Sequence, residues 1–94
     1  MESMNLEVRK EVIDLNRLVE IASQRLRFLA DEKSIDIILD LEPLFSIEGD
    51  QQLILEVITN LVENAIKYSE SHKQVVIRTC DKQQMVQVSV AQIR

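Results

Sequence analysis

Residues 50–69 carry the pattern that most restricts the fold of this 94-residue chain, because it describes a long helix with two different sides. At about 100° per residue, Asn60, Asn64 and Lys67 fall at relative angles of roughly 0°, 40° and 340° and form one polar stripe. The other side is an apolar arc formed by Ile54, Leu55, Ile58, Leu61, Val62, Ala65 and Ile66. An arc of this width is typical of a helix packed against a sheet. We therefore expect the stripe to face a cleft or water and the arc to face a core.

A second helix is predicted over residues 14–33, where apolar residues recur three and four positions apart. The recurring residues are Leu15, Leu18, Val19, Ala22, Leu26 and Leu29. Asp14 is suited to cap the first turn of this helix. We expect the charges of Arg25, Arg27 and Lys33 to form a solvated face.

The remaining segments are rich in β-branched residues and alternate in polarity, which indicates strands. They are a strand over 7–12, two strands over 35–41 and 44–47, and a hairpin over 73–90. In the first strand, Val8 and Val12 are expected to point inward. Pro43 separates the two middle strands because it cannot donate to a sheet ladder. Gly49 gives the backbone freedom to turn, and Asp50 then caps the long helix.

Together these elements predict one α+β domain over residues 1–94. It would be a two-layer sandwich with two helices packed on one face of a mixed sheet of short strands. No internal repeat or interdomain linker interrupts the chain.

The composition argues against several classes of partner. The formal net charge is −5, and the only aromatic residues are Phe28, Phe45 and Tyr68. A nucleic-acid partner is therefore not expected, because the chain offers neither a basic face nor stacking platforms. No apolar run approaches the ~20 residues that span a bilayer. With Cys80 as the single cysteine, a reducing compartment is favoured. We expect a cytoplasmic chain without membrane contact, although a longer parent protein can carry an anchor elsewhere.

The sequence from Asn60 to Ser69, Asn-Leu-Val-Glu-Asn-Ala-Ile-Lys-Tyr-Ser, resembles the N-box of the sensor histidine kinases. These proteins belong to a wider superfamily that includes DNA gyrase and heat-shock chaperone ATPases. The segment before it, residues 48–59, is similar to the one that leads into that box, and residues 6–15 and 30–41 are similar to the start of the same domain. The resemblance implies a Bergerat-type ATP-binding fold and a place in a two-component signalling system.

In the family, the second asparagine of this box gives its carboxamide oxygen to the Mg²⁺ that bridges the ATP phosphates, and here that residue is Asn64. Mg²⁺ prefers oxygen ligands and is usually held by few protein groups together with phosphates and water. The resemblance also implies that Asn60 lines the phosphate and metal site, and that Lys67 and Tyr68 approach the nucleotide. Glu63 lies about 100° from Asn64 on the helix. It could polarise a nucleophile, but a solvated carboxylate is the simpler interpretation.

Asn60 also bears on the reaction. In the ATP hydrolases of the superfamily, the position four residues before the metal-binding asparagine carries a glutamate that acts as general base. An amide cannot accept a proton at neutral pH. The resemblance therefore favours phosphoryl transfer to a protein over ATP hydrolysis. His72 is the only histidine, but it lies in a polar turn rather than on a separate acceptor helix, so we do not expect it to be phosphorylated.

The chain departs from the family pattern near residue 92. The family has an Asp-x-Gly-x-Gly segment there, whose aspartate binds adenine, whereas this chain reads Ala91-Gln92-Ile93-Arg94 and has Gly49 as its only glycine. The resemblance thus implies the N-terminal half of a catalytic domain, truncated before that box. We expect Mg-ATP to bind the parent domain, and to bind this chain alone weakly or not at all.

Two functions remain open from the sequence, beside the alternative that the chain is an unrelated small α/β domain with a chance match to the N-box. In the first, the parent transfers the ATP γ-phosphoryl group to a histidine on dimerisation helices, for relay to a response regulator, and this chain alone is inactive. In the second, the chain is a non-catalytic interaction or dimerisation module derived from that fold. Missing strands would leave an open sheet edge, and such edges are often covered by a second copy. A homodimer is therefore an expectation of either function.

Overall fold

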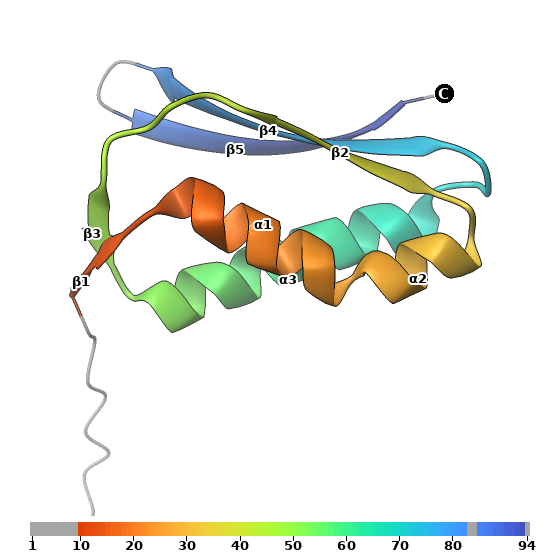
Figure 1. Cartoon of the computed structure of the whole chain (residues 1–94), viewed down its shortest axis with the longest axis horizontal. Coiled ribbons are helices and arrows are strands. Elements are labelled where there is room, and N and C mark those ends of the chain that lie inside the picture. Colours follow the sequence, from red (N-terminus) through yellow and green to blue (C-terminus); the bar gives the residue numbers. More distant parts are fainter. Residues whose placement is uncertain (1–9, 83–84, 94) are drawn as a thin grey trace, which may run out of the picture.

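The computed structural model describes residues 10–82 and 85–93, which form two layers (Figure 1). One layer is a sheet of β2 (Asp36–Leu41), β4 (Gln74–Lys82) and β5 (Met85–Ile93), in the order β2-β4-β5. The strand β2 runs parallel to β4, and β4 runs antiparallel to β5. The other layer consists of helices that all lie on one face of this sheet. The α+β fold with helices on one face of a mixed sheet, predicted from the sequence, is confirmed.

A separate two-stranded ladder sets the start of the two longer helices. In it, β1 (Glu11–Ile13) pairs antiparallel with β3 (Ile47–Gly49). Each strand runs directly into an aspartate cap: the side chain of Asp14 accepts a hydrogen bond from Arg17 N, and that of Asp50 accepts one from Leu53 N. Both predicted N-caps are therefore confirmed. Because the two strands are paired, α1 (Leu15–Arg25) and α3 (Gln51–Tyr68) begin on the same ladder.

The prediction of one continuous helix over 14–33 is wrong. The segment is divided into α1 and α2 (Arg27–Glu32), with Leu26 between them at φ −100° and ψ 2°. The Leu26 amide bonds to both Ala22 O and Gln24 O, so the helix tightens at its end instead of continuing. The side chain of Leu26 remains buried. The apolar spacing is kept across this break, and for that reason periodicity alone did not reveal it.

Three details predicted for the short strands and for Gly49 differ in the structure. The strand predicted at 44–47 lies at 47–49, because it forms only where it pairs with β1. Val12 is 72% exposed, since Ile13 beside it points into the core and side chains alternate along a strand. The part of the predicted first strand over 7–9 lies outside the described residues. Gly49 does not adopt a positive φ; instead, a Cβ there would lie 3.0 Å from Ile54 Cδ1, so glycine permits close packing.

The core lies between the helices and the sheet and is entirely aliphatic. Its buried members include Leu18, Val19 and Ala22 from α1, Ile58, Val62 and Ile66 from α3, and Val75 and Ile77 from β4. Polar links tie the two layers together at one end. The hydroxyl of buried Thr79 donates to Asn16 Oδ1 at 2.7 Å, and Asn16 Nδ2 donates to Glu42 O at 2.7 Å. Among the described residues, no helix is both long enough and apolar enough to cross a membrane.

Candidate functional site

The helix α3 has one buried side and one exposed side. Ile58, Val62 and Ile66 are buried at 3% exposure or less, and they recur every four residues along the helix. This is the centre of the apolar arc predicted from the sequence. One member of that arc, Leu61, is 47% exposed and does not belong to the core. Leu61 is exposed because it lies at the edge of the arc, about 100° from Val62.

The predicted polar stripe lies on the exposed side of α3. Asn60, Asn64, Lys67 and Tyr68 are all exposed, and Tyr68 is 80% exposed. Among the described residues, the carboxamides of Asn60 and Asn64 have no hydrogen-bond partner, and Lys67 makes no ion pair. The helix therefore gathers two amides, an amine and a phenol on one surface, and the fold does not use them for its own hydrogen bonds.

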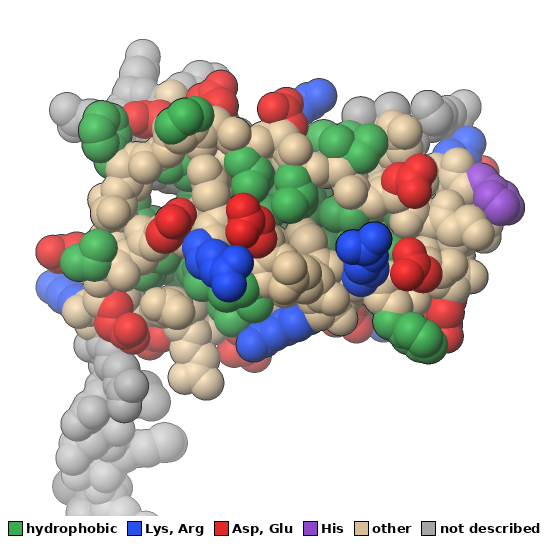
Figure 2. Space-filling view, in the orientation of Figure 1, with side chains coloured by type: hydrophobic (Ala, Val, Ile, Leu, Met, Phe, Trp, Pro, Cys, Tyr) green, Lys and Arg blue, Asp and Glu red, His purple; other side chains and the backbone are tan. Residues whose placement is uncertain are grey.

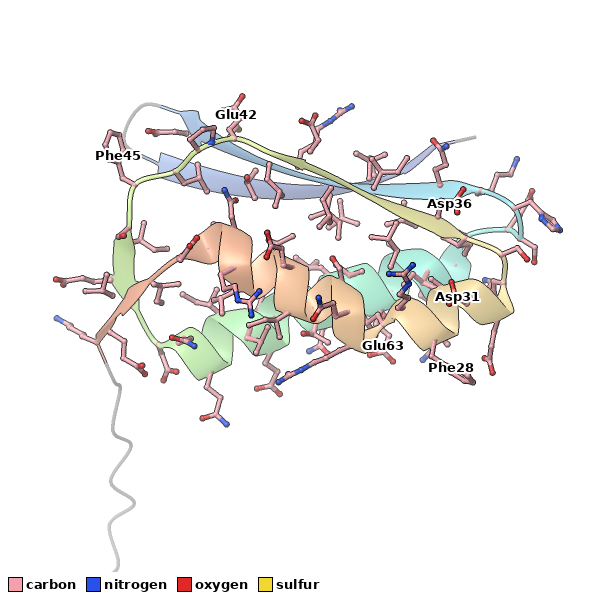
Figure 3. All side chains as sticks on the ribbon, in the orientation of Figure 1. Phe28, Asp31, Asp36, Glu42, Phe45 and Glu63 are labelled. Carbon is pink, nitrogen blue, oxygen red and sulfur yellow. The ribbon has the colours of Figure 1, made fainter. Side chains whose placement is uncertain are left out.

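Glu63 lies on the flank of α3 and is half-buried (Figure 3). At about 100° per residue it is separated from Asn64 by more than a quarter of a turn, so the two side chains leave the helix in different directions. The site that these residues form is thus an amide and amine surface, with the Glu63 carboxylate beside it rather than within it.

The same exposed face continues toward the start of α3 with apolar side chains. Leu53, Val57 and Leu61 are each about half exposed and follow one another at four-residue spacing. They border an open apolar groove of about 390 Å³. The groove is lined by Leu15, Ile47, Leu53, Ile54, Val57, Ile58 and Leu61. One face of the helix is therefore apolar in its first half and polar in its second half.

The C-terminal end of α3 is held by Lys33. Its ammonium group donates to Ile66 O at 2.9 Å, to Lys67 O at 3.0 Å and to Ser69 O. These carbonyls lie at the helix end, where few backbone amides remain to satisfy them and a positive charge is favoured. Ile66 O also accepts a hydrogen bond from Ser69 N at 3.3 Å. The Ser69 hydroxyl also donates to Ala65 O at 2.7 Å. The expectation that Lys33 belongs to a solvated face is wrong.

Lys33 matters for the candidate site because one of the residues that it holds, Lys67, belongs to the polar stripe. No local sequence signal pointed to it, since the partners are 33–36 residues apart. The contact arises because Lys33 ends α2 at the edge of the sheet where α3 also ends. His72 is exposed in the following turn at φ 67°, and its amide donates to Lys33 O.

The chemistry available on this surface is that of neutral oxygen ligands beside a positive charge. An amide oxygen can coordinate a hard cation such as Mg²⁺, provided that other groups supply the negative charge. An exposed ammonium group can pair with a phosphate as a point charge. The surface carries an amide at Asn60, which cannot act as a general base, and among the described residues of α3 the nearest carboxylates are Glu56, one turn earlier, and Glu63 on the flank. It is therefore suited to binding a phosphate-bound cation rather than to activating water.

Comparisons with known proteins identify similar sequences. No protein-family model matches the chain. The chain is 34% identical over 93 residues to the adaptive-response sensory kinase SasA of Crocosphaera subtropica, covering 95% of this chain and 24% of that relative. It is also 40% identical over 58 residues to the heme sensor protein HssS of Staphylococcus aureus, covering 62% of this chain and 12% of the relative. The chain thus spans a small part of each curated relative.

Solved structures show the same fold. The catalytic domain of the histidine kinase ThkA matches with a TM-score of 0.83 at 25% identity, covering 89% of this chain and 58% of that chain. Full-length ShkA, solved in complex with AMPPNP, matches with a TM-score of 0.82 at 24% identity, over 90% of this chain and 19% of that one. At that identity the second likeness concerns the fold alone. The chain is therefore related to the sensor histidine kinases and has the fold of their catalytic domain.

Proposed function

We propose that this chain supplies the helix that binds phosphate and magnesium in the ATP-binding domain of a two-component sensor histidine kinase. The observation that carries the proposal is the surface of α3, where Asn60, Asn64 and Lys67 are exposed together and have no protein partner among the described residues. The related fold of ShkA was solved with AMPPNP, which supports a nucleotide as the ligand.

Each residue has a role that its chemistry permits. Asn64 would give its carboxamide oxygen to Mg²⁺, and the nucleotide phosphates would supply the charge that an amide lacks. Asn60, one turn earlier on the same face, would line the same site. Lys67 would pair with a phosphate oxygen, and the exposed ring of Tyr68 would lie beside the nucleotide. Glu63 leaves the helix on the flank and has no assigned catalytic role.

The amide at residue 60 bears on the reaction class. An amide at residue 60 cannot take a proton from water. In line with the relation to the sensor histidine kinases, the parent protein would transfer the γ-phosphoryl group of ATP to a histidine nitrogen on dimerisation helices, with ADP as the leaving group. The phosphoryl group would then pass to a response regulator. A structure of ThkA in complex with the response regulator TrrA supports this class of partner.

A second function is favoured by the apolar half of the α3 surface. Leu53 and Val57 are both more than half exposed, beside the groove of about 390 Å³. The chain could act as an interaction module that covers this surface or the outer edge of β5 with a second copy. The dimerisation part of this alternative is contradicted if the chain keeps a strictly monomeric mass at high concentration.

The site is tested by titrating the chain with Mg-ATP, followed by calorimetry and by amide chemical shifts. We expect weak, saturable binding that requires Mg²⁺ and is weakened at least about tenfold by Asn64→Ala, a loss of ~1.4 kcal/mol. Gln52→Ala is the matched control, since Gln52 is an exposed amide near the start of the same helix and off the stripe. Binding that is equal in the Asn64→Ala chain, or that persists without Mg²⁺, would contradict the assignment.

A further inference from the structure

A second hollow lies on the opposite side of the helix layer from the α3 stripe, between the strand β2 and the helices α1 and α2. Its volume is about 420 Å³. Figure 2 shows apolar side chains in the space between β2 and these helices, with charged side chains at its border. The lining residues are Glu20, Ser23, Gln24, Arg27, Ala30, Asp31, Ile35, Asp36, Ile37 and Leu39. None of them belongs to the α3 stripe.

The strand that borders this hollow has one free edge. Among the described residues, β2 pairs only with β4, and it is the first strand in the sheet order. The amides of Asp36 and Glu42 donate to Lys73 O and Thr79 O on the β4 side. Backbone groups alternate in direction along a strand, so the N–H and C=O groups of Ile37, Leu39 and Leu41 point away from β4. Within the part of the chain that the structure describes, they form an unused row of donors and acceptors beside the hollow.

The floor of the hollow is apolar. Ala30 and Ile35 are buried, and Leu39 is 38% exposed although its alternation places it on the side of the sheet that faces the helices. A leucine on that side would be covered if another strand or helix packed over it. A residue of an added strand that points toward the helices would therefore meet Ile37 and Leu39, which is an apolar contact.

The charges at the border favour a basic segment. Glu20 is paired with Arg17 at 3.3 Å, but among the described residues Asp31 and Asp36 have no ion-pair partner. Both line the hollow, one from α2 and one from β2, and Figure 3 labels them at the same end of it. Arg27 is the only basic side chain in the lining. On the other face of β2, Asp36 and Asp40 recur four residues apart, and Asp40 is paired with Arg78 at 3.1 Å.

A second copy of the chain fits this edge poorly. If two β2 strands paired antiparallel about Ile38, Asp36 would lie opposite Asp40 of the other copy. If they paired about Leu39, Asp36 would lie opposite Glu42. Like charges directly opposite each other across two strands are destabilising. The net charge of −5 on each chain adds to that repulsion.

We propose that the outer edge of β2 binds an extended segment of a partner protein, which adds to the sheet as a fourth strand. The segment alternates apolar residues, which face the helices over Ile37 and Leu39, with lysine or arginine residues, which face Asp36. This mode of binding takes its affinity from main-chain hydrogen bonds and its specificity from alternate side chains. The site is separate from the α3 stripe, so it would hold whether or not the stripe binds a nucleotide.

The test uses the full chain and two fluorescent octapeptides, one of alternating lysine and valine and the other of alternating glutamate and valine. The lysine peptide should bind at least about tenfold more tightly than the glutamate peptide. Its binding should weaken as salt is raised. In NMR spectra it should shift the amide signals of Ile37, Leu39 and Leu41. Equal affinity for both peptides, or no binding of the lysine peptide at millimolar concentration, would overturn the proposal.

Two variants locate the site. Leu39→Pro removes an outward N–H while keeping the bonds from β2 to β4, because proline is tolerated at a strand edge. This variant should weaken the binding of the lysine peptide at least about tenfold. If that variant fails to fold, Asp36→Asn should weaken the binding of the lysine peptide by several-fold. Asp81→Asn makes the same change in charge at an exposed position on β4 and should leave this binding unchanged. Amide shifts confined to β5 or to Leu53, Val57 and Leu61, or shifts that follow chain concentration without peptide, would contradict the assignment.

Discussion

Replacing Ile66 with alanine should lower the free energy of unfolding by about 2–5 kcal/mol. Ile66 is 0% exposed and packs within the core between α3 and the sheet. The substitution removes apolar surface from the core and leaves a cavity that the neighbouring side chains fill only in part. A domain of this size has a total stability of about 5–15 kcal/mol. The midpoint of urea unfolding should therefore fall clearly, while the dependence of the unfolding free energy on urea concentration stays unchanged.

Leu61→Ala is the matched control for this prediction. Leu61 lies five residues earlier on the same helix, but its side chain is 47% exposed. Its removal should cost about 1 kcal/mol or less, because about half of the leucine already lies in water. Equal losses for the two variants would mean that α3 is rotated about its axis from the orientation described. In that case the polar stripe would not face outward.

The second large effect is expected for Lys33→Met. The ammonium group donates to three carbonyls at the C-terminal end of α3, and the lysine side chain is half-buried. Methionine keeps the length and the apolar stem but leaves the three carbonyls without this donor. Because hydrogen bonds to a charged group contribute about 1.5–3 kcal/mol, we expect a loss of about 2 kcal/mol in the free energy of unfolding. The measurement is chemical denaturation at neutral pH.

The same variant should loosen the part of the helix that carries the end of the stripe. Amide hydrogen exchange should increase for residues 66–69 more than for residues 54–58. Arg25→Met serves as the control, since Arg25 is exposed at the end of α1 and makes no ion pair with another described residue. Its effect should stay within about 0.5 kcal/mol. A Lys33→Met chain as stable as the Arg25→Met chain would show that the contact at the helix end contributes nothing.

The sequence was most informative where local rules decide the structure. Both aspartate caps were predictable because Asp14 and Asp50 each precede an apolar periodic run, and a cap depends on residues within one turn. The buried side of α3 followed from its period of 3.6. The layer arrangement followed from two amphipathic helices and several short strands, which can bury their apolar faces only against each other.

The errors arose where the structure depends on contacts between distant residues. The position of β3 is set by its pairing with β1, so the local strand signal at 44–47 placed it too early. The break at Leu26 keeps the same apolar residues in the core, so the three- and four-residue spacing of apolar residues does not reveal it. Lys33 contacts a helix end more than thirty residues away, and a lysine between polar residues gives no sign of such a contact.

The candidate site shows the same division. The shared face of Asn60, Asn64 and Lys67 was predictable from spacing, and their exposure agrees with it. The spacing could not predict that this face carries exposed apolar side chains at Leu53 and Val57. Their exposure depends on how much of α3 is covered by α1 and β3. The groove between β2 and the shorter helices was also not predictable. It requires the parallel pairing of β2 with β4, which leaves the other edge of β2 free.

The metal–phosphate site on α3 is tested most directly by adding ATP with Mn²⁺ in place of Mg²⁺ and recording NMR signals of the backbone amides. Mn²⁺ is paramagnetic and broadens signals close to it, so it reports where the metal–nucleotide complex lies. We expect broadening centred on residues 60–68 that is lost in the Asn64→Ala chain and is not produced by Mn²⁺ without ATP. Broadening centred instead on Asp31, Asp36 and Asp40, or unchanged in the variant, would contradict the claim that α3 holds the metal–phosphate group.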